Sequence, residues 1–243
     1  MTTYAQLAMT SQEASIGIGI SRARTAIVAA TLALGAAMVA TVLLFRPWPV
    51  RNSFLYQELA PIRDGIWTSI LIDSLAFTAV TIGLSLVVAQ LTPTRGAWLA
   101  NVGAVVATIG GVLFAMGAFA FAMLTWYVTD PAVLPIADGT RLLEYAVANP
   151  EHGMLLQLGG FMLYTLGTLV LAVALIRAGS VPRWLPSAVI VLTIAQFATS
   201  DRVLDFVQIA AMSLLVILAA LVLRRSGGGR APQQHRSPGP LQP

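Results

Sequence analysis

Cysteine and lysine are both absent from this chain of 243 residues, and its only histidines are His152 and His235. Without cysteine the chain has no disulfides, thiolate metal sites, iron–sulfur clusters or cysteine nucleophiles. Two histidines so far apart do not give the paired ligands of a haem between helices or the His-x-x-x-His spacing of a zinc protease. A nucleophile elbow and a phosphate-binding glycine loop with lysine are missing as well. We therefore expect no metal and no cofactor. Enzymatic activity has no support, and a membrane hydrolase built on dispersed carboxylates is the alternative left open.

Charge is also scarce in this sequence. Charged residues make up 10% of the chain, hydrophobic residues 57%, and the mean hydropathy is +0.81. An ordinary soluble domain has about 25% charged residues, so this chain has too few polar groups to cover its surface in water, whereas lipid requires no such cover. The net charge of +4 comes from dispersed arginines rather than a basic stripe, so we expect no nucleic-acid partner. The expected partner is the lipid bilayer.

Six apolar runs are candidates for helices that cross the membrane. A crossing needs about 20 mostly apolar residues. The predicted spans are residues 25–45, 65–91, 98–127, 154–176, 182–198 and 203–223. The first run is longer than the apolar region of a signal peptide, so we expect it to be retained. The fifth is short even with Pro182 and Pro186 in its first turn, which leaves a re-entrant segment as its alternative. The predicted fold is an all-α membrane protein, a six-transmembrane-helix bundle.

The distribution of arginines predicts the orientation. Short cytoplasmic loops are enriched in basic residues, and six crossings from a cytoplasmic N-terminus place nine arginines and one acid on the inner side. Those arginines are Arg22, Arg24, Arg95, Arg177, Arg183, Arg224, Arg225, Arg230 and Arg236. Five crossings would leave the arginine-rich tail outside. All fourteen basic residues are arginine, which is typical of a GC-rich bacterial genome, so we expect a multi-pass protein of the bacterial plasma membrane with both termini cytoplasmic.

The ends and the outer loops are less apolar than the spans. Residues 1–21 and 226–243 are expected to be disordered cytoplasmic ends of a transmembrane domain at 22–225, because they contain too little apolar surface to fold. Two stretches of the longer outer loops, 52–59 and 140–147, are amphipathic. We interpret them as short surface helices packed over the bundle.

Two glycine stripes predict helix contacts. Helices in lipid associate through close packing of small residues. The stripes are Gly103, Gly110 and Gly117 on the third span, and Gly153, Gly160 and Gly167 on or beside the fourth. Their spacing of seven residues keeps each stripe facing one neighbour only in a left-handed wrap. We expect both stripes at helix–helix contacts, with each other as one option.

Asp73 is the main candidate for a functional residue, because it lies within the second span. An aspartate at a helix centre costs about 2.5–3.5 kcal/mol on insertion scales, so such residues face the protein interior or a wet cavity. Other polar residues at similar depth or at its rim are His152, Gln157, Gln196, Arg202, Asp205 and Gln208. Together they suggest an outward-facing polar pocket. The alternatives are a protonated Asp73 bonded to Ser69 or Ser74, and scattered hydrogen bonds between helices.

The segment from Arg177 through Gly179 and Pro182 to Trp184 resembles part of uncharacterised six-helix integral membrane proteins of actinobacteria. The resemblance is clearest over residues 167–185 and extends from about the second span to the sixth. It implies a cytoplasmic turn in which glycine ends one helix and proline begins the next. It implies a topology but no substrate, so no functional residue is carried over.

Two classes of function remain. The first is a structural or partner-binding protein of the accessory-subunit type, in contact with another membrane protein or with a second copy of itself. The second is a small-molecule or ion transporter or receptor that uses the pocket around Asp73. A bare apolar face on the packed bundle would favour the first class. Carboxyl groups of Asp73 and Asp205 within about one water of each other in a hydrated cleft would favour the second.

Overall fold

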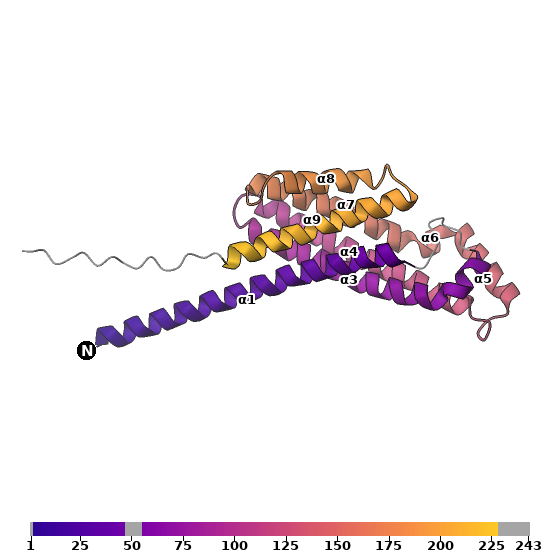
Figure 1. Ribbon diagram of the computed structural model, residues 1–243, viewed down its shortest axis with the longest axis horizontal. Coiled ribbons are helices and arrows are strands. Elements are labelled where there is room, and N and C mark those ends of the chain that lie inside the picture. The colour runs from indigo at the N-terminus through magenta and orange to yellow at the C-terminus, as the bar shows by residue number, and fades with distance from the viewer. Residues whose placement is uncertain (1, 47–54, 228–243) are drawn as a thin grey trace, which may run out of the picture.

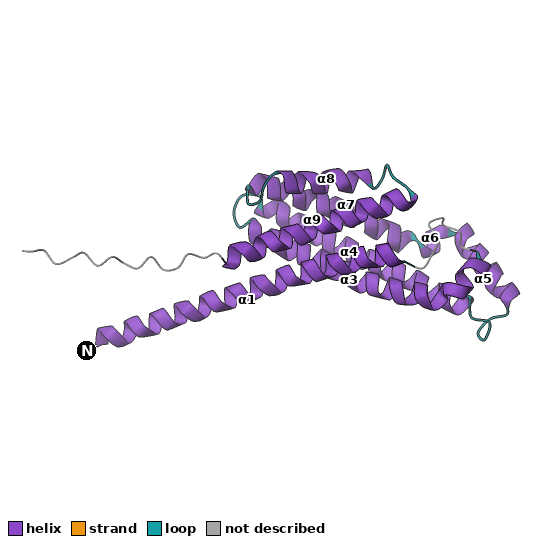
Figure 2. Ribbon diagram, viewed as in Figure 1, coloured by secondary structure: helices purple, strands orange, loops and turns teal. Residues whose placement is uncertain are grey.

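The computed structural model describes residues 2–46 and 55–227, except for the side chains of residues 2–21, 152, 153, 201 and 227. Every regular element in these residues is a helix, as Figure 2 shows. The helices are α1 (Thr2–Phe45), α2 (Tyr56–Leu59), η1 (Ala60–Ile62), α3 (Arg63–Leu91), α4 (Ala97–Val128), α5 (Ile136–Ala148), α6 (Pro150–Gly153), α7 (Leu155–Ala178), α8 (Trp184–Ala195) and α9 (Asp201–Gly227). The predicted all-helical fold is confirmed for this part of the chain.

Five of the described helices are long and apolar enough to cross a membrane. They are Arg22–Phe45, Tyr56–Leu91, Ala97–Val128, Leu155–Ala178 and Arg202–Ser226. The sixth apolar helix, α8, has 12 residues and is shorter than the predicted run of 182–198. Pro182 and Arg183 precede it, and turns follow it from Gln196, so the ends of that run are not helical.

The N-terminal end of the chain differs from the prediction. α1 begins at Thr2, so residues 2–21 are helical rather than disordered. Adding a residue to an existing helix is far easier than starting one, and no proline interrupts residues 2–21. Figure 1 shows this part of α1 projecting beyond the other helices. The predicted tail begins within α9, which ends at Gly227, and residues 228–243 lie outside the described residues.

Six of the described helices pack in a ring that follows their order in the sequence (Figure 1). α1 packs on α3, α3 on α4, α4 on α7, α7 on α8, α8 on α9, and α9 returns to α1. The largest contact joins α4 to α7, and the two contacts of α8 are the smallest in the ring. α3 also touches α7 and α9, so the ring is flattened. One buried apolar cluster joins α1, α3, α4, α7, α8 and α9.

Tight turns connect neighbouring helices at one end of the ring. Gly96, in the turn between α3 and α4, has a φ of 85°, and Gly179, which ends α7, has a φ of 63°. Both lie in the left-handed region that glycine enters without a steric penalty. A Cβ on Gly96 would also lie 2.9 Å from the carbonyl oxygen of Ala174, so the α3–α4 turn rests directly against the end of α7.

The glycine stripes of α4 and α7 face each other. An added Cβ on Gly103 would lie 3.0 Å from the backbone nitrogen of Leu171, and one on Gly117 would lie 2.6 Å from that of Gln157. A Cβ on Gly110 or Gly160 would collide with the opposite backbone, and one on Gly167 would collide with Ala107. The two helices therefore meet backbone to backbone along their length. Gly153 ends α6, and its contacts lie outside the described residues.

The end of the molecule opposite the turns is closed by a small cap. α2, η1 and α5 lie there, as Figure 1 shows for α5. Tyr56, Leu59, Ile66, Val128 and Leu143 form a second buried apolar cluster beneath them. The amphipathic stretch at 140–147 lies within α5, and the helical part of the other stretch is α2.

Candidate functional site

A cavity of about 80 Å³ lies inside the ring, and all six of its helices line it. The lining residues are Val39 and Leu43 of α1, Asp73 and Phe77 of α3, Phe114 of α4, Phe161 and Tyr164 of α7, Leu192 and Thr193 of α8, Gln196 just after α8, and Val207, Gln208, Ala211 and Met212 of α9. Three of the residues that the sequence analysis singled out therefore meet here: Asp73, Gln196 and Gln208.

Asp73 is the one charged residue among the described residues that line the cavity. Its Oδ1 atom is buried and has no hydrogen-bond partner in the part of the chain that the structure describes. The hydroxyl of Ser74, proposed as a partner from the sequence, donates instead to the carbonyl oxygen of Ala115, at 3.3 Å. A buried polar atom without a partner is costly in a protein interior. The carboxyl group of Asp73 is thus available to something that enters the cavity.

Aromatic rings form much of the cavity wall. The ring centroids of Phe77 and Phe114 are 4.7 Å apart, and those of Phe77 and Tyr164 are 4.6 Å apart. Phe161 lies 6.2 Å from Phe114 and 5.9 Å from Phe197, which follows α8. The contacts are tilted, an arrangement that aromatic pairs favour. The rings come from α3, α4 and α7 and hold these helices together around Asp73.

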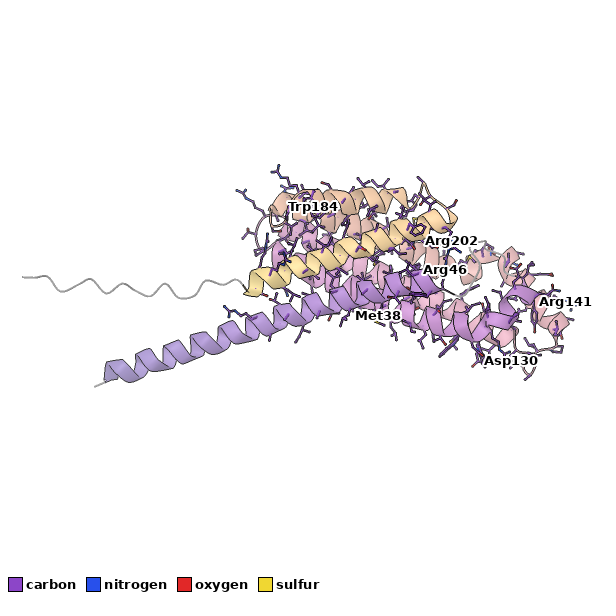
Figure 3. All side chains as sticks on the ribbon, viewed as in Figure 1. Met38, Arg46, Asp130, Arg141, Trp184 and Arg202 are labelled. Carbon is purple, nitrogen blue, oxygen red and sulfur yellow. The ribbon has the colours of Figure 1, made fainter. Side chains whose placement is uncertain are left out.

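An ion pair closes the ring between α1 and α9 on the cap side of the cavity. The Nη2 atom of Arg46 donates to Oδ2 of Asp205 at 2.7 Å, and the two side chains are 19% and 12% exposed. Asp205 precedes the lining residue Gln208 by three positions, or about 4.5 Å along the helix. Figure 3 labels Arg46 and Arg202, which lie at the ends of α1 and α9. Asp205 is thus paired with Arg46 and does not line the cavity.

Of the other predicted pocket residues, those whose side chains the structure describes do not line the cavity. Gln157 lies on α7 at the α4–α7 contact, where its backbone faces Gly117. Arg202 is exposed and does not line the cavity, and its positive charge acts on the nearby carboxylate of Asp205. His152 lies in α6, and its side chain is outside the described residues. The prediction used only depth along a helix, whereas the face of the helix also decides which side chains reach the cavity.

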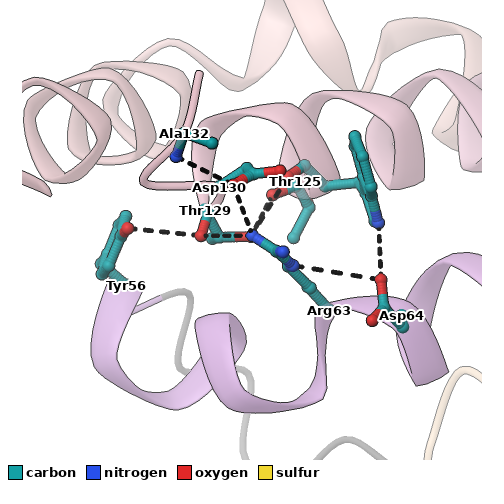
Figure 4. A network of polar contacts seen from close by, with 8 residues as sticks. Tyr56, Arg63, Asp64, Thr125, Thr129, Asp130 and Ala132 are labelled. Atoms are coloured by element: carbon teal, nitrogen blue, oxygen red, sulfur yellow. Dashed lines mark hydrogen bonds and ion pairs between the residues drawn. The ribbon is translucent and has the colours of Figure 1, made fainter. Parts of the chain in front are cut away.

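A second polar cluster lies in the cap, around Arg63 (Figure 4). The Nη1 atom of Arg63 contacts the carbonyl oxygen of Thr129 at 3.2 Å and Oδ1 of Asp130 at 3.1 Å. Its guanidinium carbon lies 5.5 Å from the ring centre of Trp126. The indole nitrogen of Trp126 donates to Asp64 at 2.8 Å. These interactions tie the start of α3 to the end of α4.

The charge of Asp130 is stabilised by the cap. The backbone N–H of Ala132 donates to Oδ1 of Asp130 at 3.0 Å, and the guanidinium of Arg63 adds a hydrogen bond and a positive charge. Together they lower the pKa of Asp130 from its ordinary value of 3.8. Asp130 and Arg63 neutralise each other's charge in an ion pair, which is typical of a structural cluster rather than a binding site.

Two features of the site escaped the sequence analysis. Arg46 was assigned to an outer loop, and its partner is 159 positions away, so only the closed ring reveals the pair. The aromatic wall was also missed. Phe77 lies one helical turn after Asp73, a signal that was available, but Phe114 and Tyr164 join it only through the packing of α4 and α7.

No family model, no curated protein and no solved structure matches this chain.

Proposed function

We propose that this protein is a multi-pass protein of the bacterial plasma membrane that binds a small molecule or ion in the cavity around Asp73, as a transporter or receptor does. The observation that supports this function is the convergence of all six ring helices on one cavity with a single carboxylate. Ligand sites in helical membrane proteins lie between helices, where a few polar groups are placed among apolar ones. A bundle held only by packing has no need of such a cavity.

Six crossings are part of the proposal, because the direction of α9 supports them. Phe161 and Tyr164 of α7 line the Asp73 cavity together with Gln208 of α9. Farther from the cap, Leu171 and Leu175 of α7 line a small apolar gap with Leu215 and Leu218 of α9. α7 and α9 therefore run in the same direction, which supports a return across the bundle through α8 between them. A re-entrant segment would bring α9 back antiparallel to α7.

Tryptophans at the two ends of α4 support a membrane around its whole length. Trp and Tyr favour the two membrane–water interfaces. Trp98 and Trp126 are about 42 Å apart along the helix, close to the roughly 40–45 Å of a bilayer with its headgroups. Asp64 accepts a hydrogen bond from Trp126, and Asp73 is about 14 Å further along α3. This depth puts Asp73 in the outer part of the hydrocarbon region.

The positive-inside rule supports a cytoplasmic location for both termini. The turn end of the ring has Arg95 between α3 and α4, Arg177 in the last turn of α7, Arg183 just before α8, and Arg224 and Arg225 at the end of α9. The N-terminal part of α1 lies at the same end (Figure 1). The cap would then face outward, and Asp73 would lie in the outer half of the bundle. The resemblance of residues 167–185 to the six-helix proteins of actinobacteria agrees with this topology.

The proposed function is tested by ligand-induced stabilisation of the purified protein in lipid nanodiscs. A ligand that binds only the folded state raises stability by about 2.7 kcal/mol at 100 times its Kd. A panel of small amines, amino acids, carboxylates and sugars is screened by thermal unfolding, with Asp73→Asn as the test variant. Asp138→Asn is the matched control, because the side chain of Asp138 is 57% exposed in the cap. The proposal requires a ligand that stabilises the wild type and the control but not Asp73→Asn. A panel without effect, or equal effects on all three proteins, would contradict it.

One observation favours the structural or partner-binding class as a second candidate. α5 buries Leu143 in the cap but leaves Ile136 and Tyr145 60% and 64% exposed. Exposed apolar residues on a helix outside the bundle suit a contact with a second protein. In cells of the source organism that lack the gene, Tyr145→Glu should then fail to restore the phenotype while Asp73→Asn restores it. The proposed ligand-binding function requires the opposite result.

A further inference from the structure

The charge balance of the Asp73 cavity favours a positively charged ligand. The described lining residues contain one carboxylate and no arginine or histidine. On the cap side, Arg46 pairs with Asp205, and the charge of Arg202 also acts on Asp205. Asp73 takes part in none of the ion pairs between described residues. In a medium of low polarity, a single carboxylate attracts a cation and rejects an anion.

The other lining groups suit an ammonium ion better than a metal ion. Ca²⁺ takes six to eight oxygen ligands, and Mg²⁺ demands a near-octahedral set, whereas this cavity offers one carboxylate. The described residues contain no cluster of three or more acidic, histidine or cysteine side chains that could hold a metal. Gln196, Gln208 and Thr193 add oxygen atoms that accept hydrogen bonds from N–H groups. The rings of Phe77, Phe114, Phe161 and Tyr164 add aromatic surface, which attracts organic cations.

The size of the cavity limits the ligand. Its volume is about 80 Å³, and one water-sized group needs about 10–15 Å³ on this measure. The space therefore holds about five or more groups of that size, which fits an ammonium ion with a short or branched alkyl part. A sugar, a nucleotide or a peptide would not fit without a rearrangement of the ring.

We propose that the Asp73 cavity selects a small alkylammonium ion, with its N–H groups on the Asp73 carboxylate and its alkyl part against the aromatic wall. This inference rests on the proposed function, because it names the class of ligand for the same cavity. The carboxylate of Asp205 is compensated by Arg46 at 2.7 Å and by the charge of Arg202, and it lies about one helical turn nearer the cap than Gln208. It does not compete for the ammonium group.

The test uses two molecules of nearly the same shape and different charge. The tert-butylammonium ion and tert-butanol each have five heavy atoms, and only the first is charged at neutral pH. Thermal unfolding of the full chain in nanodiscs is measured over a concentration series of each, for the wild type, Asp73→Asn, and the control Asp138→Asn. We expect the wild type and the control to bind the ammonium ion at least tenfold more tightly than the alcohol, and Asp73→Asn to bind the two about equally.

A second variant distinguishes the contribution of the aromatic rings to binding from that of the Asp73 carboxylate. Phe114→Leu keeps an apolar side chain but removes one aromatic ring from the wall, and should weaken ammonium binding about fivefold without weakening that of tert-butanol. If Asp73→Asn fails to fold, the selective loss of ammonium binding in Phe114→Leu still tests whether the cavity prefers a cation.

The outcomes distinguish the two proposals. Equal binding of alcohol and ammonium ion by the wild type would overturn the cation selectivity and leave a ligand-binding cavity. A preference for the ammonium ion that survives in Asp73→Asn would remove Asp73 from the site and overturn the selectivity argument. Binding of neither molecule, together with an inactive screening panel, would overturn both proposals.

Discussion

The backbone contact between α4 and α7 gives the most direct test of the fold. In Gly110→Ala the new Cβ would lie 2.7 Å from the carbonyl oxygen of Gly160 and 2.7 Å from the carbonyl carbon of Leu163, and it would also collide with the backbone nitrogen of Tyr164. All three atoms belong to the backbone of a packed helix, so no side chain can turn away. The two helices must separate locally, and overpacking of this kind costs about 1–3 kcal/mol.

Gly159→Ala is a matched control on the opposing helix. Nothing lies within 4 Å of the position that its Cβ would occupy. Alanine favours a helix over glycine by about 1 kcal/mol in each case, so Gly159→Ala should be neutral or stabilising. Gly110→Ala gains the same helix-propensity free energy, but the collision with the backbone of α7 costs more stability than this gain. We expect a net loss of up to about 2 kcal/mol for Gly110→Ala, and a difference of about 1–3 kcal/mol between the two variants.

The difference is measured by unfolding both variants and the wild type in mixed micelles with increasing SDS. The intrinsic tryptophan fluorescence reports on folding, and the chain has five tryptophans. The midpoint should fall for Gly110→Ala and stay or rise for Gly159→Ala. If the two variants unfold at the same SDS fraction, α4 and α7 do not meet backbone to backbone, and the position of the cavity beside them loses its basis.

Two further predictions concern the polar pairs. Removing either partner of the mostly buried Arg46–Asp205 pair, as Arg46→Gln or Asp205→Asn, should destabilise the protein by about 3 kcal/mol, because the ion pair at 2.7 Å is lost where water reaches little of either side chain. The double variant should lose clearly less than the sum of the two single losses, measured as a double-mutant cycle by the same SDS titration. Additive losses would contradict the pair. The cap should weaken in acid, because the folded-state pKa of Asp130 is lowered. The stability that the ionised carboxylate of Asp130 contributes is fully present above the ordinary pKa of 3.8. It is lost as the pH falls through the lowered pKa of the folded state. Unfolding of the wild type between pH 5 and pH 2.5 should show this loss, and Asp130→Asn should show a smaller pH dependence; equal dependence in both would exclude Asp130 as its source.

Much of the fold follows from the lengths of the apolar runs. The bounds of α3, α4 and α7 lie within about two residues of the predicted spans, since each run ends at a turn or a proline-rich or charged segment that lipid does not tolerate. The errors lie where the signal is not apolarity. α1 extends to Thr2 through residues of mixed polarity, and α8 is shorter than the run from 182 to 198. Helix propensity and local turns decide those ends, and hydropathy does not measure either.

From the sequence, only the depth of the site residues along their helices could be predicted. Asp73, Gln196 and Gln208 were placed at the same level and they line one cavity, but Gln157 was placed at that level too and faces the glycine stripe of α4. Rotation of a helix by one residue, about 100°, separates these outcomes. A single sequence fixes such a rotation only where a stripe marks the face, as the glycines do on α4 and α7. The contact of α9 with α1, which brings Arg46 to Asp205, has no local pattern in the sequence that would predict it.

The position of the cavity follows from the unequal spacing of the helices around the ring. On one side, the glycine stripes bring the backbones of α4 and α7 together and leave no room between them. On the other side, α8 has 12 residues and makes the smallest contacts in the ring. It is therefore too short to pack against α7 and α9 along their full length, and it leaves their cap-side parts less covered. Space therefore remains where α8 ends, at Gln196, and Asp73 faces that space from α3. A ring with six helices of equal length and spacing would fill its centre with side chains. The short α8 thus places a gap beside a carboxylate, and this combination is the physical basis of the proposed site.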